Sequence, residues 1–181
     1  MKGKKSEIRL TLPEGVVAAL EEKRVVLSGP RGSLSRLVAE PDLKLELTEG
    51  GRVILLRHRL TNKRGRRVLG STAAHIRNMA KGVSKGFAYR LKICSGHFPM
   101  SVAIEGKQVV VRNFLGEKAP RRVVIKGDVV LRLEKDEIVV EGIDKEAVGQ
   151  AALDIEQLTR VRARDRRIFQ DGIYIVQRGD G

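Results

Sequence analysis

The chain has 181 residues, of which 36 are lysine or arginine and 22 are aspartate or glutamate, so its formal net charge is +14. Hydrophobic residues make up 41% of the sequence, which excludes wholesale disorder, while the positive charge favours a polyanionic partner. The single cysteine, Cys94, excludes an intramolecular disulfide and a zinc site built from several thiolates.

The sequence has none of the segments that typify export or membrane insertion. The basic start, Met1–Lys5, is not followed by the apolar run of a signal peptide. No apolar stretch reaches the roughly 18 residues that a membrane-spanning helix needs. We therefore expect a cytoplasmic protein with no membrane partner.

The first half of the chain is predicted to form short strands followed by one helix. Two β-branched runs in Lys23–Val38, joined by the turn residues Ser28–Gly32, predict a β-hairpin. Further strands are predicted at Leu43–Leu47, where apolar and polar residues alternate, and at Val53–Leu56. Apolar residues at helical spacing then predict a helix whose inner face is formed by Leu69, Ala73, Ile76 and Ala80.

The second half repeats these landmarks in the same order. Lys107–Ile125 resembles the hairpin segment, Val129–Leu133 and Ile138–Val140 are β-branched runs, and Asp144 suits the N-cap of a helix. The inner face of that helix is formed by Val148, Ala151, Ile155 and Leu158. Four matching landmarks in one order indicate a duplicated domain.

We therefore predict an α+β fold of two tandem duplicated domains, each an antiparallel sheet packed against one helix. The boundary falls near Gly82–Gly86, so residues 1–82 would form the N-terminal domain and residues 83–181 the C-terminal domain with its basic tail. The first copy carries extra residues between its last strand and its helix. They lie in Arg57–Arg67, which is the most basic segment of the chain.

Positive charge is unevenly distributed along the chain. Residues 1–92 hold 21 basic and 8 acidic side chains, whereas the remainder holds 15 basic and 14 acidic ones. In that near-neutral half the basic residues still cluster, at Lys118–Lys126 and at Arg160–Arg167. A single basic run is ordinarily a solvated surface, but several runs in one small protein favour an external partner. Nucleic acid is favoured over a membrane, because no apolar helical face lies opposite the basic residues.

Two other nucleic-acid motifs match the chain only in part. Lys85–Lys92 resembles the first half of the signature strand of RNA-recognition motifs, but Arg90 and Lys92 break the pattern, so Phe87 and Tyr89 are expected in the core. The segment Gly29–Gly32 resembles the phosphate-clamping loop of KH domains, yet it joins two strands where a KH loop joins two helices. A tight hairpin turn is the better interpretation.

No arrangement of residues predicts catalysis. Cys94 and His97 are the only pair of thiol and imidazole close in sequence, and nothing in the sequence shows an orienting group beside them. The carboxylates form no isolated pair suited to general acid–base catalysis. No spacing of histidine, cysteine and aspartate residues is typical of a metal site. We therefore expect a protein that is not an enzyme and needs no cofactor or metal.

Several segments together resemble one family, the large-subunit ribosomal protein L6 in its archaeal and eukaryotic form. The resemblance covers essentially the whole chain. It is carried by the motifs Lys81–Phe87, Ser95–Pro99, Asn113–Lys118, Gly142–Gln150 and Arg164–Tyr174. The Gly-Ile-Asp-Lys turn and the Arg-Asp-Arg-Arg-Ile-Phe-Gln-Asp-Gly tail are far more specific than any glycine pattern in the chain.

The resemblance implies a structural constituent of the large ribosomal subunit, with two related domains that arose by duplication. It implies rRNA binding near the sarcin-ricin loop, beside other ribosomal proteins and near the docking site of GTPase translation factors. Much of the RNA contact would come from the second domain, through Lys118, Arg121, Arg122, Arg160, Arg162, Arg164, Arg166 and Arg167. A free regulatory RNA- or DNA-binding protein is the alternative.

Charge and position add further candidates for RNA contact. His97 is expected in a loop that touches RNA. The basic segment before the first helix supplies Lys63, Arg64, Arg66 and Arg67. Arginine suits RNA binding because its planar guanidinium can donate two hydrogen bonds to one phosphate. The chain has few aromatic residues for base stacking.

Overall fold

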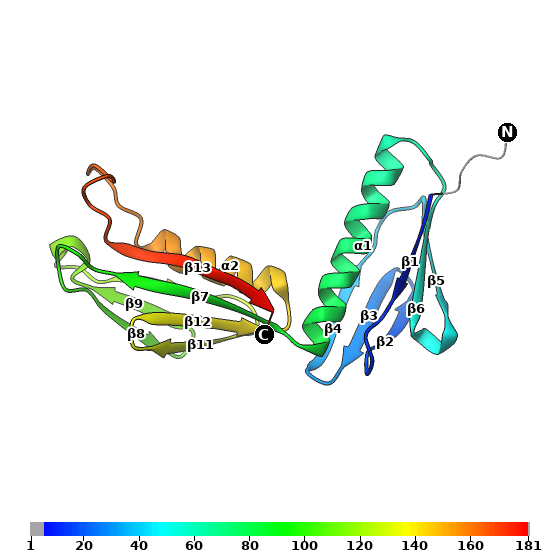
Figure 1. Ribbon diagram of the computed structural model, residues 1–181, viewed down its shortest axis with the longest axis horizontal. Helices are drawn as coiled ribbons and strands as arrows, with labels where there is room; N and C mark the ends of the chain where they lie inside the picture. Colours follow the sequence, from blue (N-terminus) through cyan, green and yellow to red (C-terminus); the bar gives the residue numbers. More distant parts are fainter. Residues whose placement is uncertain (1–5, 181) are drawn as a thin grey trace. The chain divides into compact units, whose positions relative to one another are not determined.

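The computed structural model describes residues 6–180, apart from the side chains of Ser6 and Asp180, and the basic start Met1–Lys5 lies outside this range. The chain forms two compact units (Figure 1). The first unit ends at Gly86 and the second begins at Phe87. Each unit combines antiparallel strands with one α-helix, which confirms the predicted α+β class and the tandem duplication.

The first unit holds two three-stranded antiparallel sheets, with strand orders β2-β3-β4 and β1-β6-β5. Its helix packs against strands of both sheets. The strands are β1 (Ser6–Thr11), β2 (Val17–Glu21), β3 (Arg24–Gly29), β4 (Gly32–Leu37), β5 (Leu43–Thr48) and β6 (Val53–His58), followed by helix α1 (Lys63–Ser84). The prediction of a single sheet per unit missed this division, which depends on pairing between distant strands.

The predicted hairpin is β3 and β4. Gly29 pairs with Gly32 at its tip. The backbone N–H of Arg31 donates to the carbonyl oxygen of Val83 at 3.0 Å, and a Cβ atom on Gly29 would lie 2.7 Å from the same oxygen. The turn therefore packs directly on the last turn of α1, which explains why glycine is needed there.

The second unit repeats this plan and adds one strand. Its sheets have the orders β10-β9-β8 and β11-β12-β7-β13. The elements are β7 (Phe87–Cys94), β8 (Ser101–Glu105), β9 (Gln108–Arg112), β10 (Arg121–Val124), β11 (Val129–Glu134), β12 (Glu137–Gly142), α2 (Lys145–Leu158) and β13 (Gly172–Asp180). The order β7-β12-β11 corresponds to β1-β6-β5 of the first unit, so the duplication extends to strand topology.

Each unit has its own hydrophobic core beneath its helix. All four residues of the predicted inner face of α1 are buried. In α2, Val148, Ala151 and Ile155 are buried and Leu158 is partly buried. Phe87 and Tyr89 lie in the second core, at 2% and 8% exposure, as expected of core residues and not of a base-stacking surface.

The helices differ in length because the extra residues of the first copy extend α1. Helix α1 has 22 residues and α2 has 14. The basic segment expected between strand and helix therefore lies partly in α1, which starts at Lys63. Within residues 6–180, neither helix is sufficiently long and apolar to cross a membrane.

Candidate nucleic-acid interface

The N-terminal end of α1 carries the first group of predicted RNA-binding residues. Asn62 is the N-cap, and its Oδ1 accepts a hydrogen bond from the backbone N–H of Gly65 at 2.9 Å. The first turn holds no acidic residue. Four exposed basic residues, which we name the α1 basic end, are Lys63, Arg64, Arg66 and Arg67.

The backbone beneath the α1 basic end is tightly packed. Gly65 is buried, and a Cβ atom there would overlap the carbonyl oxygen of Leu60 and lie 2.7 Å from Nδ1 of His58. His58 is also buried, and its Nδ1 accepts a hydrogen bond from the N–H of Leu60 at 3.0 Å. The connection from β6 to α1 therefore holds the basic residues in a fixed position.

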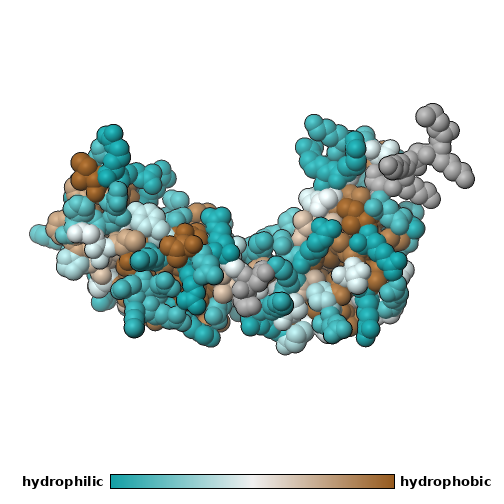
Figure 2. All heavy atoms as spheres, in the orientation of Figure 1, coloured by the Kyte–Doolittle hydropathy of each residue, from teal (hydrophilic) through white to brown (hydrophobic). Residues whose placement is uncertain are grey.

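The charge of the α1 basic end is unfavourable for the isolated protein. A helix N-terminus carries a partial positive charge, so cations there are repelled by the helix as well as by one another. None of the four residues has an acidic partner among the described residues. An external polyanion would remove this repulsion. Figure 2 shows the surface around this end of α1 as hydrophilic.

The second group lies on residues 160–171, which we name the tail and which connect α2 to β13. Val161 and Asp171 are buried and anchor its two ends. Four exposed arginines that form no ion pair within 4.0 Å among residues 6–180 are Arg160, Arg162, Arg164 and Arg166. The charges of Arg162 and Arg164 still act on the Glu117 carboxylate. Arg167 is also exposed, but its Nη2 lies 2.8 Å from Oδ2 of Asp165. That hydrogen bond lowers the pKa of the Asp165 carboxyl.

Arg121 is engaged within the protein. Its Nη1 donates to the carbonyl oxygens of Leu158 and Arg160, at 2.9 and 3.1 Å. Its Nε donates to Glu117 at 2.8 Å, and the guanidinium lies 4.3 Å from the centroid of the Phe114 ring. The hydrogen bond from Arg121 lowers the pKa of Glu117. Arg121 therefore ties the end of α2 and the start of the tail to β10.

The neighbours of Arg121 have no such role. Lys118 and Arg122 are exposed, and neither has an acidic partner within the described part of the chain. Members of the predicted basic cluster Lys118–Lys126 therefore have two different roles. Arg121 positions the tail, whereas Lys118 and Arg122 remain accessible to an external anion.

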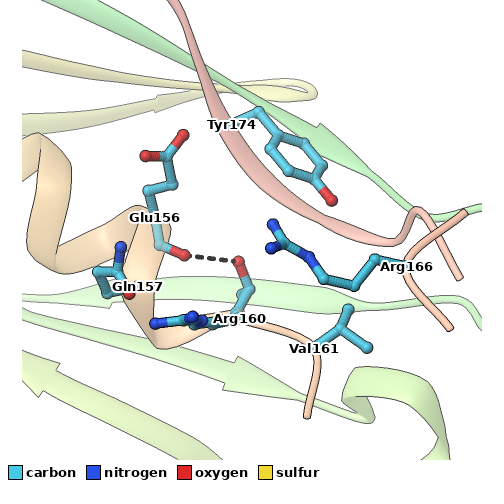
Figure 3. A pocket seen from close by; sticks show the side chains of 7 residues that line it. Glu156, Gln157, Arg160, Val161, Arg166 and Tyr174 are labelled. Atoms are coloured by element: carbon cyan, nitrogen blue, oxygen red, sulfur yellow. Dashed lines mark hydrogen bonds between the residues drawn. The ribbon is translucent and has the colours of Figure 1, made fainter. Parts of the chain in front are cut away.

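A hollow of about 350 Å³ separates the end of α2 from β13. Figure 3 shows the Arg166 guanidinium beside the Tyr174 ring, whereas the Arg160 side chain points toward Gln157. The buried Thr159 closes the base of the hollow, where the Thr159 hydroxyl accepts a hydrogen bond from the N–H of Ile173 at 2.8 Å. Two arginines therefore line one hollow of the surface.

The loop after β7 is fastened to the tail by one buried carboxylate. Asp171 Oδ2 lies 2.7 Å from Nδ1 of His97, and Oδ1 accepts hydrogen bonds from the backbone N–H groups of Gly96 and His97. Burial of Asp171 by itself would raise its pKa, but the hydrogen bonds from His97 and Gly96 outweigh this effect. The pKa of Asp171 therefore lies below its ordinary value.

Sequence reasoning did not identify Asp171 as a functional residue. An aspartate followed by glycine is an ordinary turn signal, and its partner His97 is distant in sequence. The nearest signal was the family-specific tail motif that contains it. Arg121 was assigned to RNA for a similar reason, because a basic run does not reveal which of its members face the protein.

The described residues contain no group of three or more histidine, cysteine or acidic side chains arranged to hold a metal ion. Cys94 is a half-buried free thiol on β7. His97 is directed by its Nδ1 toward Asp171. The second unit is thus organised around basic side chains and their supports.

Comparison with known proteins agrees with this architecture. The family model described as ribosomal protein L6 matches the chain twice, over residues 12–86 and 98–172. These matches correspond to the two units.

Curated relatives cover nearly the whole chain. A protein of Methanothrix thermoacetophila is 45% identical over 170 residues, which is 94% of this chain and 96% of the relative. A protein of Haloarcula marismortui is 41% identical over 176 residues, or 96% of this chain and 98% of the relative. Both are named large ribosomal subunit protein uL6. Two matching units and these relatives show that this chain belongs to the ribosomal protein L6 family, whose members are structural proteins and not enzymes.

Proposed function

We propose that the chain is a structural constituent of the large ribosomal subunit that binds rRNA near the sarcin-ricin loop and stabilises its packing. The name of the relatives supports the subunit, and the family resemblance of the sequence motifs supports the rRNA region. The observation that carries rRNA binding is a set of ten exposed basic side chains that form no ion pair within 4.0 Å in the described chain. They are Lys63, Arg64, Arg66, Arg67, Lys118, Arg122, Arg160, Arg162, Arg164 and Arg166.

Five arginines of the sheets differ from this set. Arg9, Arg57, Arg90, Arg112 and Arg132 lie on strands, and each has an acidic partner within 4.0 Å. Their positive charge is therefore balanced inside the protein. The α1 basic end and the tail each gather several unbalanced side chains, and RNA phosphates there would take the place of acidic partners.

The proposed mechanism is neutralisation of RNA phosphates. Each arginine or lysine that meets a phosphate releases condensed counterions, which favours binding at low salt and weakens it as salt rises. Contacts of this kind recognise the shape of folded RNA and its backbone more than the edges of bases. Two rigid units with basic ends would thereby stabilise one packing of neighbouring RNA helices.

Other partners follow from the same location. Neighbouring ribosomal proteins would contact the parts of the surface that RNA leaves free. GTPase translation factors would dock nearby without requiring direct contact with this chain. Residence in the large subunit also supports the expected cytoplasmic location.

Sedimentation tests this function directly. A tagged copy of the chain, expressed in cells of its source, is expected to travel with large subunits through a sucrose gradient. High salt should release it, because its contacts with RNA are electrostatic. A chain that stays at the top of the gradient and never enters large subunits would instead be a free regulatory RNA- or DNA-binding protein.

A further inference from the structure

We propose that His97, oriented by the buried carboxylate of Asp171, donates a hydrogen bond from Nε2 to one RNA backbone phosphate, and that Arg164 completes this phosphate site. The inference rests on the proposed rRNA binding and assigns one ligand group to one place on the second unit. Asp171 is the positioning residue of this site, because it acts on RNA only through His97.

The first line of support is the fixed orientation of the imidazole. The side chain of His97 is 41% exposed, whereas that of Asp171 is 2% exposed. Oδ2 of Asp171 holds Nδ1 of His97 at 2.7 Å, and Oδ1 accepts a hydrogen bond from the backbone N–H of the same residue at 3.0 Å. Nδ1 is thus occupied inside the protein, so Nε2 is the ring nitrogen that an external group can reach.

The second line of support is the ring of Phe169. The centroid of the His97 imidazole lies 5.1 Å from the centroid of this ring. The Cζ atom of Arg164 lies 4.9 Å from the same centroid. One phenyl ring therefore contacts both the imidazole and an exposed guanidinium that forms no ion pair within 4.0 Å in the described chain. Phe169 thus positions two potential donors of this part of the tail.

The third line of support is the space beside the imidazole. A hollow of about 560 Å³ is bounded by the loop Ser95–His97 on one side and by Ile168, Gln170 and Tyr174 on the other. The hydroxyl of Tyr174 donates to the carbonyl oxygen of Gln170 at 3.1 Å, which keeps this wall in position. The hollow gives a ribose–phosphate unit room to approach the imidazole.

Charge determines which ligand group this site accepts. A histidine that donates Nδ1–H to a carboxylate presents Nε2 as an acceptor when neutral and as a donor when protonated. A phosphate only accepts hydrogen bonds, so phosphate binding requires the protonated ring. Binding of RNA phosphate should therefore favour the protonated ring of His97, and affinity should rise as pH falls.

Other titratable groups around the imidazole do not produce this pH dependence. Asp171 is ionised at neutral pH, because its pKa lies below its ordinary value despite burial. The thiol of Cys94 on β7 and the phenol of Tyr174 on β13 line the same hollow, and burial raises the pKa of Tyr174 further above neutrality. Among the side chain types around this hollow, histidine is the one whose ordinary chemistry allows a change of charge between about pH 5 and pH 8.

The experiment measures affinity for protein-free large-subunit rRNA at constant salt across this range of pH. The full-length chain should bind more tightly as pH falls, by up to about tenfold per unit for one linked proton. His97→Gln should flatten this profile, so that affinity no longer rises as pH falls. Asp171→Asn should flatten it also, because a neutral amide cannot balance the imidazolium. His75→Gln, a change in the first unit, is the matched control and should keep the original profile.

The outcomes separate this inference from the proposed function. A chain that fails to bind rRNA at every pH contradicts the proposed function itself. A chain that binds rRNA with strong salt dependence, but whose pH profile is the same after His97→Gln, contradicts only the phosphate site. The phosphate site is also contradicted if affinity rises with pH and His97→Gln removes this rise. A neutral Nε2 would then accept a hydrogen bond from a ribose hydroxyl. Should Asp171→Asn fail to fold, the exposed His97→Gln variant decides the question alone.

Discussion

The guanidinium of Arg121 donates a hydrogen bond to the carbonyl oxygen of Leu158 at 2.9 Å. This contact supplies a partner to the last turn of α2, whose final carbonyl groups have no partner within the helix. The same guanidinium reaches Arg160, the first residue of the tail. Position and stability of the tail are thus linked through one side chain.

Replacing Arg121 with alanine should destabilise the second unit by about 1–3 kcal/mol, because charged hydrogen bonds to two carbonyl groups are lost. Both tyrosines of the chain, Tyr89 and Tyr174, lie in this unit, so tyrosine fluorescence during urea unfolding reports on it selectively. Arg122→Ala is the control and should change stability by less than about 0.5 kcal/mol. Equal effects of the two changes would refute the positioning role of Arg121.

Two glycines of α1 should respond oppositely to alanine. Gly70 has open space around it, so Gly70→Ala should stabilise the first unit by up to about 1 kcal/mol through helix propensity. Gly65→Ala should cost about 1–3 kcal/mol or more, because its Cβ would overlap the carbonyl oxygen of Leu60. Urea unfolding followed by far-ultraviolet circular dichroism measures both. Similar stability of the two variants would mean that the turn before α1 is not tightly packed.

The α1 basic end should show a conflict between stability and RNA binding. Arg64→Glu places an acid in the first turn and should stabilise the helix by about 0.3–1 kcal/mol, while rRNA affinity falls. Arg77→Glu makes the same change of charge at an exposed position far from the first turn, and should not stabilise the helix in this way. Parallel unfolding and filter-binding measurements are required. Unchanged rRNA affinity after Arg64→Glu would remove this end from the interface.

Replacing Arg164, Arg166 and Arg167 together with alanine should weaken rRNA binding and flatten its salt dependence. The slope of log affinity against log salt should shrink by up to about 0.9 for each lost phosphate contact on the scale of B-DNA. A control of equal charge replaces three arginines that have acidic partners on the strands, Arg90, Arg112 and Arg132. An unchanged slope in the tail variant would show that these arginines contact solvent or protein instead.

Local pattern predicts much of this fold but not its long-range pairing. The hairpin at Gly29–Gly32 and the inner faces of both helices depend on residues close together in the sequence. Residue spacing therefore predicts them, and the structure confirms them. The division of each unit into two sheets depends on which distant strands pair. Strand β13 was missed for the same reason, since it is specified by its antiparallel pairing with β7.

The same limit applies to the interface. Charge clusters identify the regions that hold unpaired arginines, because net charge is a property of the sequence. They cannot distinguish Arg121, which contacts two carbonyl groups of its own chain, from Arg122 beside it. The pairing of His97 with Asp171 is also invisible in sequence, because the fold alone brings these distant residues together.

Crosslinking of protein to rRNA on intact large subunits, followed by identification of the joined peptides and nucleotides, tests the central proposal most directly. We expect crosslinks from tail peptides within residues 160–171 to nucleotides near the sarcin-ricin loop, with a second set from the α1 basic end. Tail crosslinks confined to remote rRNA, or their complete absence from subunits that contain the protein, would contradict it.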